Sequence, residues 1–354
     1  QAFGSASHEF HRVAAAGVMP NGNIAVADAG DHLVKVFSAG GAFLFSVGGT
    51  GSGPGQIQAI SSFVIDPDGG FAVYDRALNR LTYWTNDGQL EDISSIPSLP
   101  SGLFNSLSVL PGGGLIGVRL ETPATSRNLG HAGLRWDDAV AVYIDRQLQA
   151  RDTIAVFPGN ERYYHPMDQH EYVRFTIPFF AARAVFDYRN DCVYAIVSRL
   201  VSVGEFCLEE KRQLSNVGPG LRRRFDWTGA RLDLKRGDVI EHARAAVQRR
   251  TGLSLQPDEI APRYPFDFPR ERPPAGGLVV SEAGFIWLGD YFETDMSATS
   301  WMVFDPDGVL RVRYELPQVF RILSVGRKYL LALERDELDV ERVVLYGLPE
   351  NRTL

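Results

Sequence analysis

A repeated pattern of short β-forming runs and tight turns constrains the fold of this chain more than any other sequence feature. Residues 24–56 contain three such runs, with a turn after each of the first two and a Gly/Pro-rich exit after the third. The pattern then returns, because residues 64–75 repeat residues 18–28 and residues 80–88 repeat residues 32–40. A repeat of roughly 45 residues with four strands per unit is typical of a β-propeller blade.

Continuing the pattern along the chain gives six units. Unit three begins near Ser106 and is interrupted by a predicted long loop at residues 121–137, and a second long connection follows at residues 158–173. Unit six has only three clear strands, and we expect residues 1–10 to complete this last blade and close the ring. The sequence therefore predicts an all-β fold: one six-bladed β-propeller domain of four-stranded blades spanning residues 1–354.

Residues 235–274 break the β pattern and predict a helix-containing insertion before blade five. Asp238 is placed to cap a helix, and Gly252 is placed to end it. The apolar positions between them fall on one helical face; they are Val239, Ile240, Ala243, Ala246 and Val247. Residues 257–274 are proline-rich and are expected to lie over the surface as an ordered loop.

Charge and hydropathy exclude two classes of partner. The net charge is −7 and the basic residues are spread along the chain, which argues against electrostatic binding of nucleic acid. No apolar run is long enough for a transmembrane segment. The chain begins at Gln1 without methionine, which fits a shortened chain or a mature form whose export signal has been removed.

The two cysteines bear on the compartment. Cys192 and Cys207 flank a predicted hairpin centred near Arg199, so they would lie opposite each other on neighbouring strands. A disulfide there would fit an exported protein, whether periplasmic, cell-surface or secreted. Two buried free thiols are the alternative, and the sequence leaves both open.

The stretch at residues 24–56 resembles an NHL repeat, and the whole chain is similar to the six-bladed NHL-type propellers of bacteria. The resemblance is closest over residues 13–87 and recurs over residues 277–348, where the Phe-Asp-Pro-Asp-Gly turn returns. It implies the propeller fold. It implies no single reaction, because this fold carries both binding modules and enzymes.

The predicted loops differ in length between the two faces of the ring. The turns from first to second strand and from third to fourth strand are short, whereas the other connections are long, and long loops on a rigid scaffold commonly carry binding. Aromatic and arginine side chains on or near these loops suit recognition of a protein or another extracellular ligand. The candidate ligand- or partner-binding residues are Arg119, Arg135, Trp136, Arg162, Tyr163, Tyr164, His165 and Arg199. The alternative is that the aromatic residues simply cover the blade edge.

Acidic residues at the ends of the second strands point to a possible cation site. Asp28, Asp75, Asp290 and Glu334 would ring the channel mouth, and carboxylates are suitable ligands for Ca²⁺. For Asp28 and Asp75 the alternative is a structural role, in which each carboxylate accepts hydrogen bonds from its own turn. No other cofactor is indicated.

Common catalytic motifs are missing from the sequence. The Gly-rich residues 48–55 follow a strand but lack the lysine of a phosphate-binding loop, and there is no Gly-x-Ser-x-Gly elbow. The sequence thus favours a non-catalytic propeller that binds a partner through its long-loop face, and leaves catalysis open. The alternatives are a metal-dependent hydrolase or lyase, lactonase-like or amidating-lyase-like, acting at the channel mouth, and a structural subunit of an envelope assembly.

Overall fold

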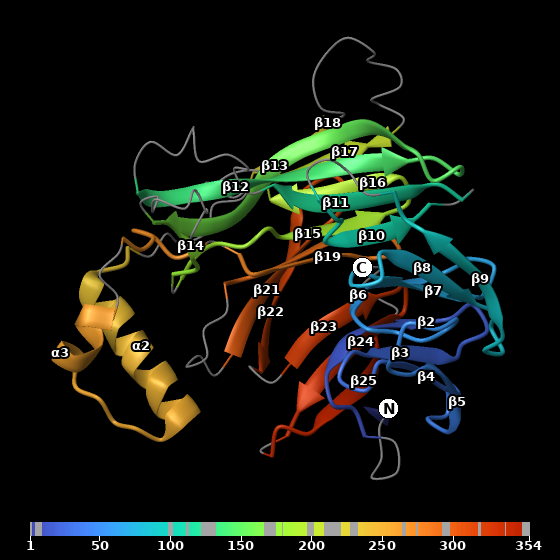
Figure 1. Ribbon diagram of the computed structural model, residues 1–354, viewed down its shortest axis with the longest axis horizontal. Helices are drawn as coiled ribbons and strands as arrows, with labels where there is room; N and C mark the ends of the chain where they lie inside the picture. Colours follow the sequence, from blue (N-terminus) through green and yellow to red (C-terminus); the bar gives the residue numbers. More distant parts are fainter. Residues whose placement is uncertain are drawn as a thin grey trace.

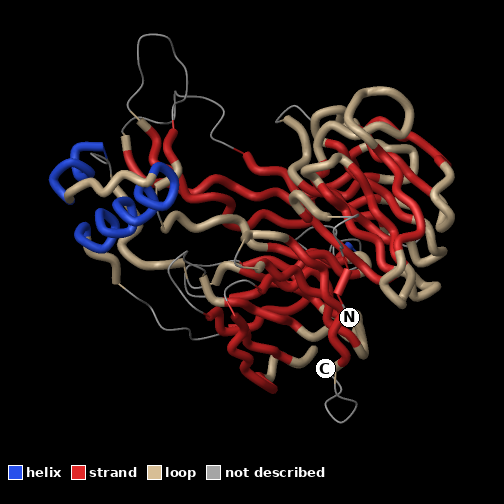
Figure 2. The backbone as a smooth tube through the Cα atoms, turned by 90° about the horizontal axis from the view of Figure 1, so that it is seen from below, coloured by secondary structure: helices blue, strands red, loops and turns tan. Residues whose placement is uncertain are grey.

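The structure is a computed structural model of the 354-residue chain. It describes residues 2–3, 9–97, 102–110, 113–121, 132–165, 175–178, 180–196, 202–208, 221–226, 233–263, 267–273, 275–291, 298–317, 320–336 and 338–348. Six antiparallel sheets are arranged around a centre, as Figures 1 and 2 show from two directions. The prediction of an all-β six-bladed propeller is therefore confirmed.

Blades one and two have four strands each, joined in chain order. Blade one consists of β2 (Val13–Val18), β3 (Ile24–Asp28), β4 (Leu33–Phe37) and β5 (Phe43–Gly48). Blade two consists of β6 (Ile60–Ile65), β7 (Phe71–Asp75), β8 (Arg80–Trp84) and β9 (Leu90–Ser95). The predicted turns lie between these strands, and Gly22 and Gly41 have φ values of 85° and 82°, a conformation that glycine adopts without steric cost.

Blades four and five repeat the four-stranded arrangement. Blade four consists of β15 (Phe186–Arg189), β16 (Cys192–Ile196), β17 (Ser202–Cys207) and β18 (Leu221–Asp226). Blade five consists of β19 (Gly277–Val280), β20 (Ile286–Gly289), β21 (Ala298–Phe304) and β22 (Leu310–Pro317). In blade four, Cys192 pairs directly with Cys207 across the β16–β17 ladder, and the two form a disulfide with a Cα–Cα distance of 4.1 Å.

Blade six takes its outermost strand from the other end of the chain. It consists of β23 (Phe320–Val325), β24 (Tyr329–Arg335) and β25 (Glu341–Gly347), and β1 (Ala2–Phe3) pairs with β25. The Glu341 carboxylate also accepts the Val13 N–H of blade one, and the Arg321 guanidinium donates to the Val13 carbonyl at 2.6 Å. The first and last blades are thus joined both by strand pairing and by side chains.

Blade three departs from the predicted four strands. Its sheet contains β10 (Ser106–Val109), β11 (Leu115–Glu121), β12 (Gly133–Ile144), β13 (Ala150–Tyr164) and a fifth strand, β14 (Phe175–Thr176). The prediction of loops was wrong for residues 133–137 and 158–164, which extend β12 and β13 beyond the length of an ordinary blade strand. We call this extension, residues 133–137 with 158–164, the blade-three arm.

The hydrophobic core is divided among the interfaces between blades. Within the described residues, each of six buried clusters combines side chains from two neighbouring blades, including the pair formed by blades six and one. Phe71 and Trp84, for example, pack with Val34 and Val36 of blade one. Each sheet therefore buries both of its faces, and the ring is held together by sheet-on-sheet packing.

The insertion before blade five contains α2 (Arg236–Thr251), α3 (Pro257–Ile260) and the 3-10 turn η2 (Ala261–Arg263). Gly252 ends α2 with a φ of 72°, as predicted. The cap assignment was wrong by three residues: Lys235 is the N-cap, and Asp238 lies in the first turn, where its carboxylate accepts the Lys235 N–H at 2.8 Å. No helix in the described part of the chain is long and apolar enough to cross a membrane.

Figures 1 and 2 place these helices to one side of the ring, and in Figure 1 this is the side to which the far ends of β12 and β13 extend. The blade-three arm and the insertion thus lie on one side of the molecule although about 70 residues separate them in the sequence.

Candidate functional site

The blade-three arm gathers most of the predicted binding residues. Arg135 lies opposite Arg162 and Trp136 lies opposite Glu161 in the β12–β13 register, and Tyr163 and Tyr164 pair onward with β14. These side chains therefore sit on paired strands and not on loops. A paired strand holds a side chain in a defined direction more firmly than a loop does, so the arm is a preorganised surface.

The base of the arm is fastened by a buried polar cluster. The Asp137 carboxylate is 1% exposed, accepts the Tyr164 hydroxyl hydrogen, and lies 2.7 Å from Arg162 Nε. Burial raises the pKa of Asp137 above its usual value, although Tyr164 and Arg162 act in the opposite direction. Since Arg162 and Tyr164 are committed to this cluster, their contribution is to hold the arm in place.

The outer side of the arm carries a second group of contacts. The Arg162 guanidinium lies over the Phe175 ring at 4.0 Å from its centroid, and His165 Nε2 lies 2.7 Å from the Thr176 hydroxyl. Tyr163 meets the His165 ring edge-on with centroids 5.2 Å apart. These contacts tie β14 to the arm and match the alternative in which the aromatic residues cover a blade edge.

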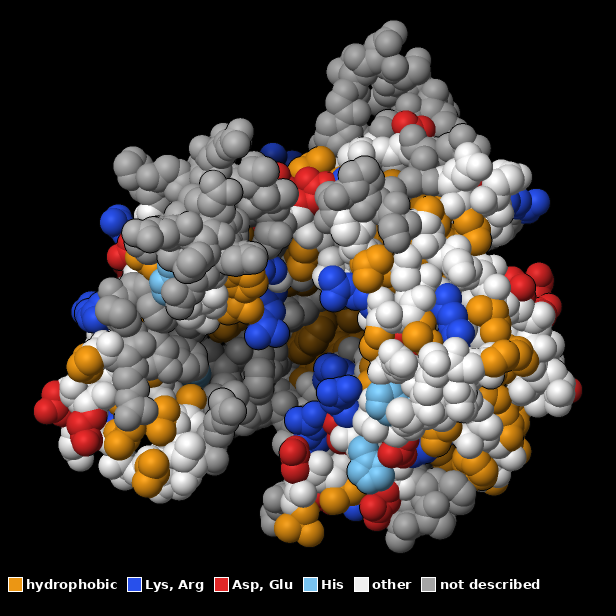
Figure 3. Space-filling view, in the orientation of Figure 1, with side chains coloured by type: hydrophobic (Ala, Val, Ile, Leu, Met, Phe, Trp, Pro, Cys, Tyr) orange, Lys and Arg blue, Asp and Glu red, His pale blue; other side chains and the backbone are white. Residues whose placement is uncertain are grey.

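A cleft of about 710 Å³ opens between the arm, the start of blade four and residues 267–273 of the insertion. Its apolar walls include Trp136, Phe268 and prolines from both sides, while Arg183 and Arg270 are exposed at its border. Figure 3 shows the molecule hollowed between the helical insertion and the blades, with hydrophobic side chains deep inside and Lys and Arg side chains around them. We call the cleft lined by the arm, the start of blade four and residues 267–273 the arm cleft.

Sequence analysis identified Trp136 but missed the other side of the arm cleft. Phe268 and Arg270 belong to the proline-rich segment, which was expected only to lie over the surface, and Arg183 precedes β15. The local signal was the alternation of prolines with aromatic and charged residues in residues 265–273. Nothing local indicates that this segment faces the arm.

Two further predicted binding residues lie elsewhere. Arg119 is on β11 and pairs with Glu121 of the same strand. Arg199 lies outside the described residues.

The carboxylates of two predicted cation ligands, Asp28 and Asp75, accept hydrogen bonds from groups of the protein itself. The Asp28 carboxylate accepts the N–H groups of His11, Arg12 and Gly30 and the Lys35 ammonium. The Asp75 carboxylate accepts the N–H groups of Gln58 and Leu78. Both therefore fasten the chain where it crosses from one blade to the next.

The other two predicted ligands are arranged differently. Burial, and then the charge of Glu315, raise the pKa of Asp290. Glu334 accepts the Tyr346 hydroxyl hydrogen, and burial together with this contact raises the pKa of Tyr346 to about 12. In the described part of the chain, the groups of three ligand-type side chains that converge within 4.8 Å are His11 with Asp28 and Asp31, and the disulfide cysteines with Glu205. The Ca²⁺ hypothesis stays a prediction, and a test of it is given in the Discussion.

A second cavity, of about 770 Å³, lies in the central channel. It is lined by the innermost strands of all six blades: β2, β6, β10, β15, β19 and β23. Pro20, Pro67 and Glu282, which belong to the turns after three of these strands, are exposed at its border, so the cavity opens on the short-turn face. Sequence analysis placed function on the opposite face and missed this cavity.

Asp187 in the channel wall makes stability depend on pH. Its carboxylate accepts the N–H groups of Val280 and Tyr188, at 2.7 and 2.8 Å, yet burial raises its pKa to about 6 from 3.8. Because the folded-state pKa lies above the unfolded one, the ionised carboxylate costs stability, and this cost develops between about pH 4 and pH 6 and persists above. We expect Asp187→Asn to remove up to about 3 kcal/mol of this pH-dependent loss.

Urea unfolding at about pH 4 and about pH 8 measures the effect. As the pH rises from about 4 to about 8, the free energy of unfolding of wild type should fall by more than that of Asp187→Asn. Equal pH dependence in the two proteins would show that Asp187 ionises normally in the channel.

Comparisons with known proteins agree with the architecture. Residues 16–107 match the model of a family described as "6-bladed beta-propeller". No curated protein gives a significant match.

Several solved structures resemble the chain over nearly its whole length. A "Putative exported protein" from Bacteroides fragilis is 14% identical with a TM-score of 0.52, covering 99% of this chain and 95% of its own. A member of the DUF4221 family from Bacteroides vulgatus is 11% identical with a TM-score of 0.57, covering 98% and 96%. The virginiamycin B lyase of Staphylococcus aureus is 11% identical with a TM-score of 0.47, covering 99% of both chains. At these identities the likeness concerns the fold alone, and the chain is a six-bladed β-propeller.

Proposed function

We propose that this chain is an exported, non-catalytic propeller that binds an extended protein segment in the arm cleft. The observation that carries the proposal is the cleft itself, built by an elongated hairpin on one side and by an insertion on the other. Both are additions to the repeating blade, and both lie on the side where the long connections gather. Irregular additions to a rigid scaffold are common sites of binding.

The chemistry of the cleft suggests the kind of segment it binds. Trp136 and Phe268 offer aromatic surface and the adjoining prolines are rigid, which suits an apolar or aromatic anchor residue. Arg183 and Arg270 are exposed at the border, and neither guanidinium has a hydrogen bond or ion pair with another described residue. Asp267 is an exposed acidic residue there, whereas Glu161 is buried and accepts the Ala182 N–H. The exposed border is therefore more basic than acidic, and we expect an acidic residue beside the anchor.

Export is part of the proposal. The Cys192–Cys207 disulfide fits an oxidising compartment, where such bonds form and persist. The Bacteroides fragilis protein of similar fold is also described as exported.

The test is selection of short random peptides on the immobilised protein. Enriched peptides should carry an aromatic or large aliphatic residue close to Asp or Glu. Arg183→Glu and Arg270→Glu should each weaken their binding about ten- to a hundredfold, because each removes a charge-assisted contact and adds a repulsion. Trp136→Ala should weaken it as well.

Arg327→Glu is the matched control. Arg327 is also exposed but lies in the β23–β24 turn, on the short-turn face. If Arg327→Glu weakened binding as much as Arg183→Glu, the effect would reflect net charge and the arm cleft would not be the site. Peptides without acidic residues would contradict the proposed chemistry.

A further inference from the structure

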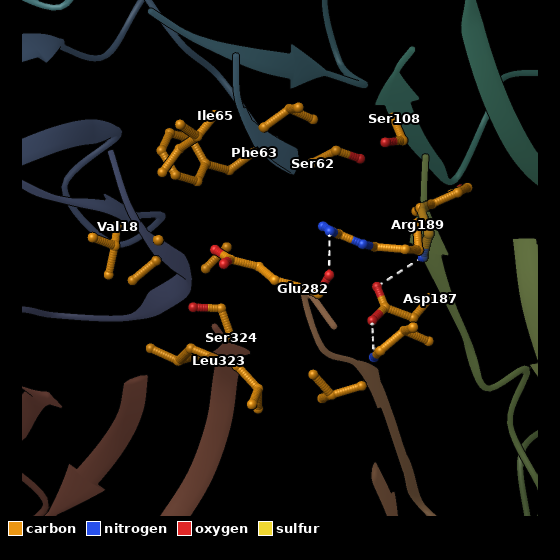
Figure 4. Close-up of a pocket in the computed structure, with 18 of the residues that line it drawn as sticks. Val18, Ser62, Phe63, Ile65, Ser108, Asp187, Arg189, Glu282, Leu323 and Ser324 are labelled. Atoms are coloured by element: carbon orange, nitrogen blue, oxygen red, sulfur yellow. Dashed lines mark hydrogen bonds between the residues drawn. The ribbon is translucent and has the colours of Figure 1, made fainter. Parts of the chain in front are cut away.

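The polar groups of the central channel cavity converge on one space. Figure 4 shows Ser62, Ser108 and Arg189 on one side of it and Glu282 and Ser324 on the other. They come from five different blades: β6, β10, β15, the turn after β19, and β23. Val18, Phe63, Ile65 and Leu323 supply apolar surface between them. A concave, mostly apolar wall with a few convergent polar groups is the usual form of a small-molecule site, and about 770 Å³ lies within the usual range.

Some polar side chains of the cavity form hydrogen bonds that join neighbouring blades. The Ser62 hydroxyl accepts the Leu107 N–H and donates to Ser106, which joins the inner strands of blades two and three. Asp187 joins blades four and five in the same way through the Val280 N–H. These hydrogen bonds satisfy backbone N–H groups at the edges of the inner strands. Ser62 and Asp187 therefore have little hydrogen-bonding capacity left for a ligand.

Other groups keep unused hydrogen-bonding capacity. One Arg189 nitrogen donates to the Glu282 carbonyl at 2.6 Å, which leaves the rest of its donors without partners among the described residues. One Glu282 carboxylate oxygen accepts the Tyr329 hydroxyl at 2.9 Å, and the other accepts no hydrogen bond within the same set. The Ser108 hydroxyl also has no partner in the described structure. The cavity thus offers both donors and acceptors.

The charges in the cavity decide between classes of ligand. Arg189 is positive and Glu282 is negative, and they lie next to each other, while the Asp187 carboxylate accepts the N–H groups of Val280 and Tyr188. A strongly anionic ligand would therefore meet a like charge at Glu282, and a strongly cationic ligand would meet one at Arg189. A neutral ligand avoids this repulsion. Its hydroxyl groups can donate to and accept from the polar side chains of the cavity, and its C–H faces can pack against Phe63.

We infer that the central channel is a binding site for a small neutral carbohydrate, entered from the short-turn face. This site is separate from the arm cleft and does not depend on the proposed function. Arg189 and Glu282 bind the sugar hydroxyls, Ser108 adds a hydroxyl contact, and Phe63 covers the ring.

The test is isothermal titration with a panel of neutral mono- and disaccharides, with phosphate and citrate as anionic probes. We expect at least one sugar to bind wild type, and Arg189→Ala to weaken that binding about tenfold or more. Ser108→Val should weaken it severalfold, and since Ser108 has no structural hydrogen bond in the described residues this variant should keep the fold. Arg146→Ala, in the outer turn of blade three, is the matched control and should bind as wild type does.

The possible results separate clearly. Sugar binding that is lost in the two channel variants and kept in Arg146→Ala and Trp136→Ala supports the site. The inference is overturned if no sugar in the panel binds, if only the anions bind, or if the channel variants bind sugar as wild type does.

Discussion

Asp28→Ala is expected to lower the free energy of unfolding by about 3–5 kcal/mol, because it takes one of two carboxylates from a buried ammonium and leaves three backbone N–H groups without their acceptor. Asp28 is 0% exposed, and its carboxylate lies 2.9 Å from Lys35 Nζ, which is itself almost fully buried. The same carboxylate accepts three backbone N–H groups at 3.0–3.1 Å. After the substitution, the Asp31 carboxylate and the Glu9 carbonyl, each 2.6 Å from Lys35 Nζ, remain as its acceptors.

The pH dependence of this contribution follows from the pKa of Asp28. Burial acts to raise that pKa, but the hydrogen bonds from Lys35, Arg12 and His11 lower it further than burial raises it, so the net shift is downward. A lowered folded-state pKa gives stability that is present above about pH 4 and lost as the pH falls through the folded pKa. The difference between wild type and Asp28→Ala should therefore shrink under acid conditions.

The repeat supplies a matched control in Asp75→Ala. Asp75 holds the equivalent position in blade two and accepts two N–H groups, but Thr82 takes the place of Lys35 there. No buried cation loses a carboxylate there, so we expect a smaller loss of about 1–3 kcal/mol. Urea unfolding of both variants measures the difference, and equal losses would show that the ammonium is not the cause.

The same proteins test the Ca²⁺ hypothesis. If Asp28 is structural, chelation leaves the melting temperature of wild type unchanged. If chelation lowers it and Asp28→Ala abolishes that response, Asp28 is a metal ligand and the structural account is wrong.

The ring of blades could be predicted because its signals are local. Alternating β-forming runs and turns such as those at Gly22 and Gly41 recur at regular intervals, and each blade needs only itself and its neighbours. The structural alternative weighed for Asp28 and Asp75 followed from the same repeat, since both end a second strand just before a turn.

The arm was missed because strand signals are weak outside the core. Core strands such as β3 and β7 are buried at every residue and are mostly apolar, but residues 133–137 and 158–164 pair mainly with each other. Arg135 and Arg162 can face each other there without burying a hydrophobic face, so the sequence has the composition of a loop. The pairing is long-range and leaves no local periodicity.

The channel cavity was missed for a different reason. Arg189, Glu282 and Ser108 are far apart in the sequence, and each is unremarkable where it stands. Only closure of the ring brings the inner strands together. Strand alternation shows that Asp187 and Arg189 share one face of β15, but it does not show which face borders the channel.

Reducing the Cys192–Cys207 disulfide is expected to cost about 3 kcal/mol of stability, since the bond closes a loop with a sequence separation of 15 residues. Both sulfurs are buried in the core between blades four and five, at 3% and 1% exposure, so reduction in the folded state should be slow. Removing the bond increases the conformational entropy of the unfolded chain. Replacing both cysteines with alanine also adds small cavities at the same interface. The double variant should therefore lose somewhat more than the reduced wild type.

Unfolding in urea with and without a strong reductant separates these two contributions. Wild type should be destabilised by the reductant, whereas the Cys192→Ala/Cys207→Ala variant should be indifferent to it, and the gap between the reduced wild type and the variant gives the cost of the cavities. A wild type that is equally stable with and without reductant would mean that the two thiols are not joined, which was the alternative that the sequence left open. Since a bond worth about 3 kcal/mol is lost where thiols are kept reduced, a positive result also supports the proposal that this propeller is exported to an oxidising compartment.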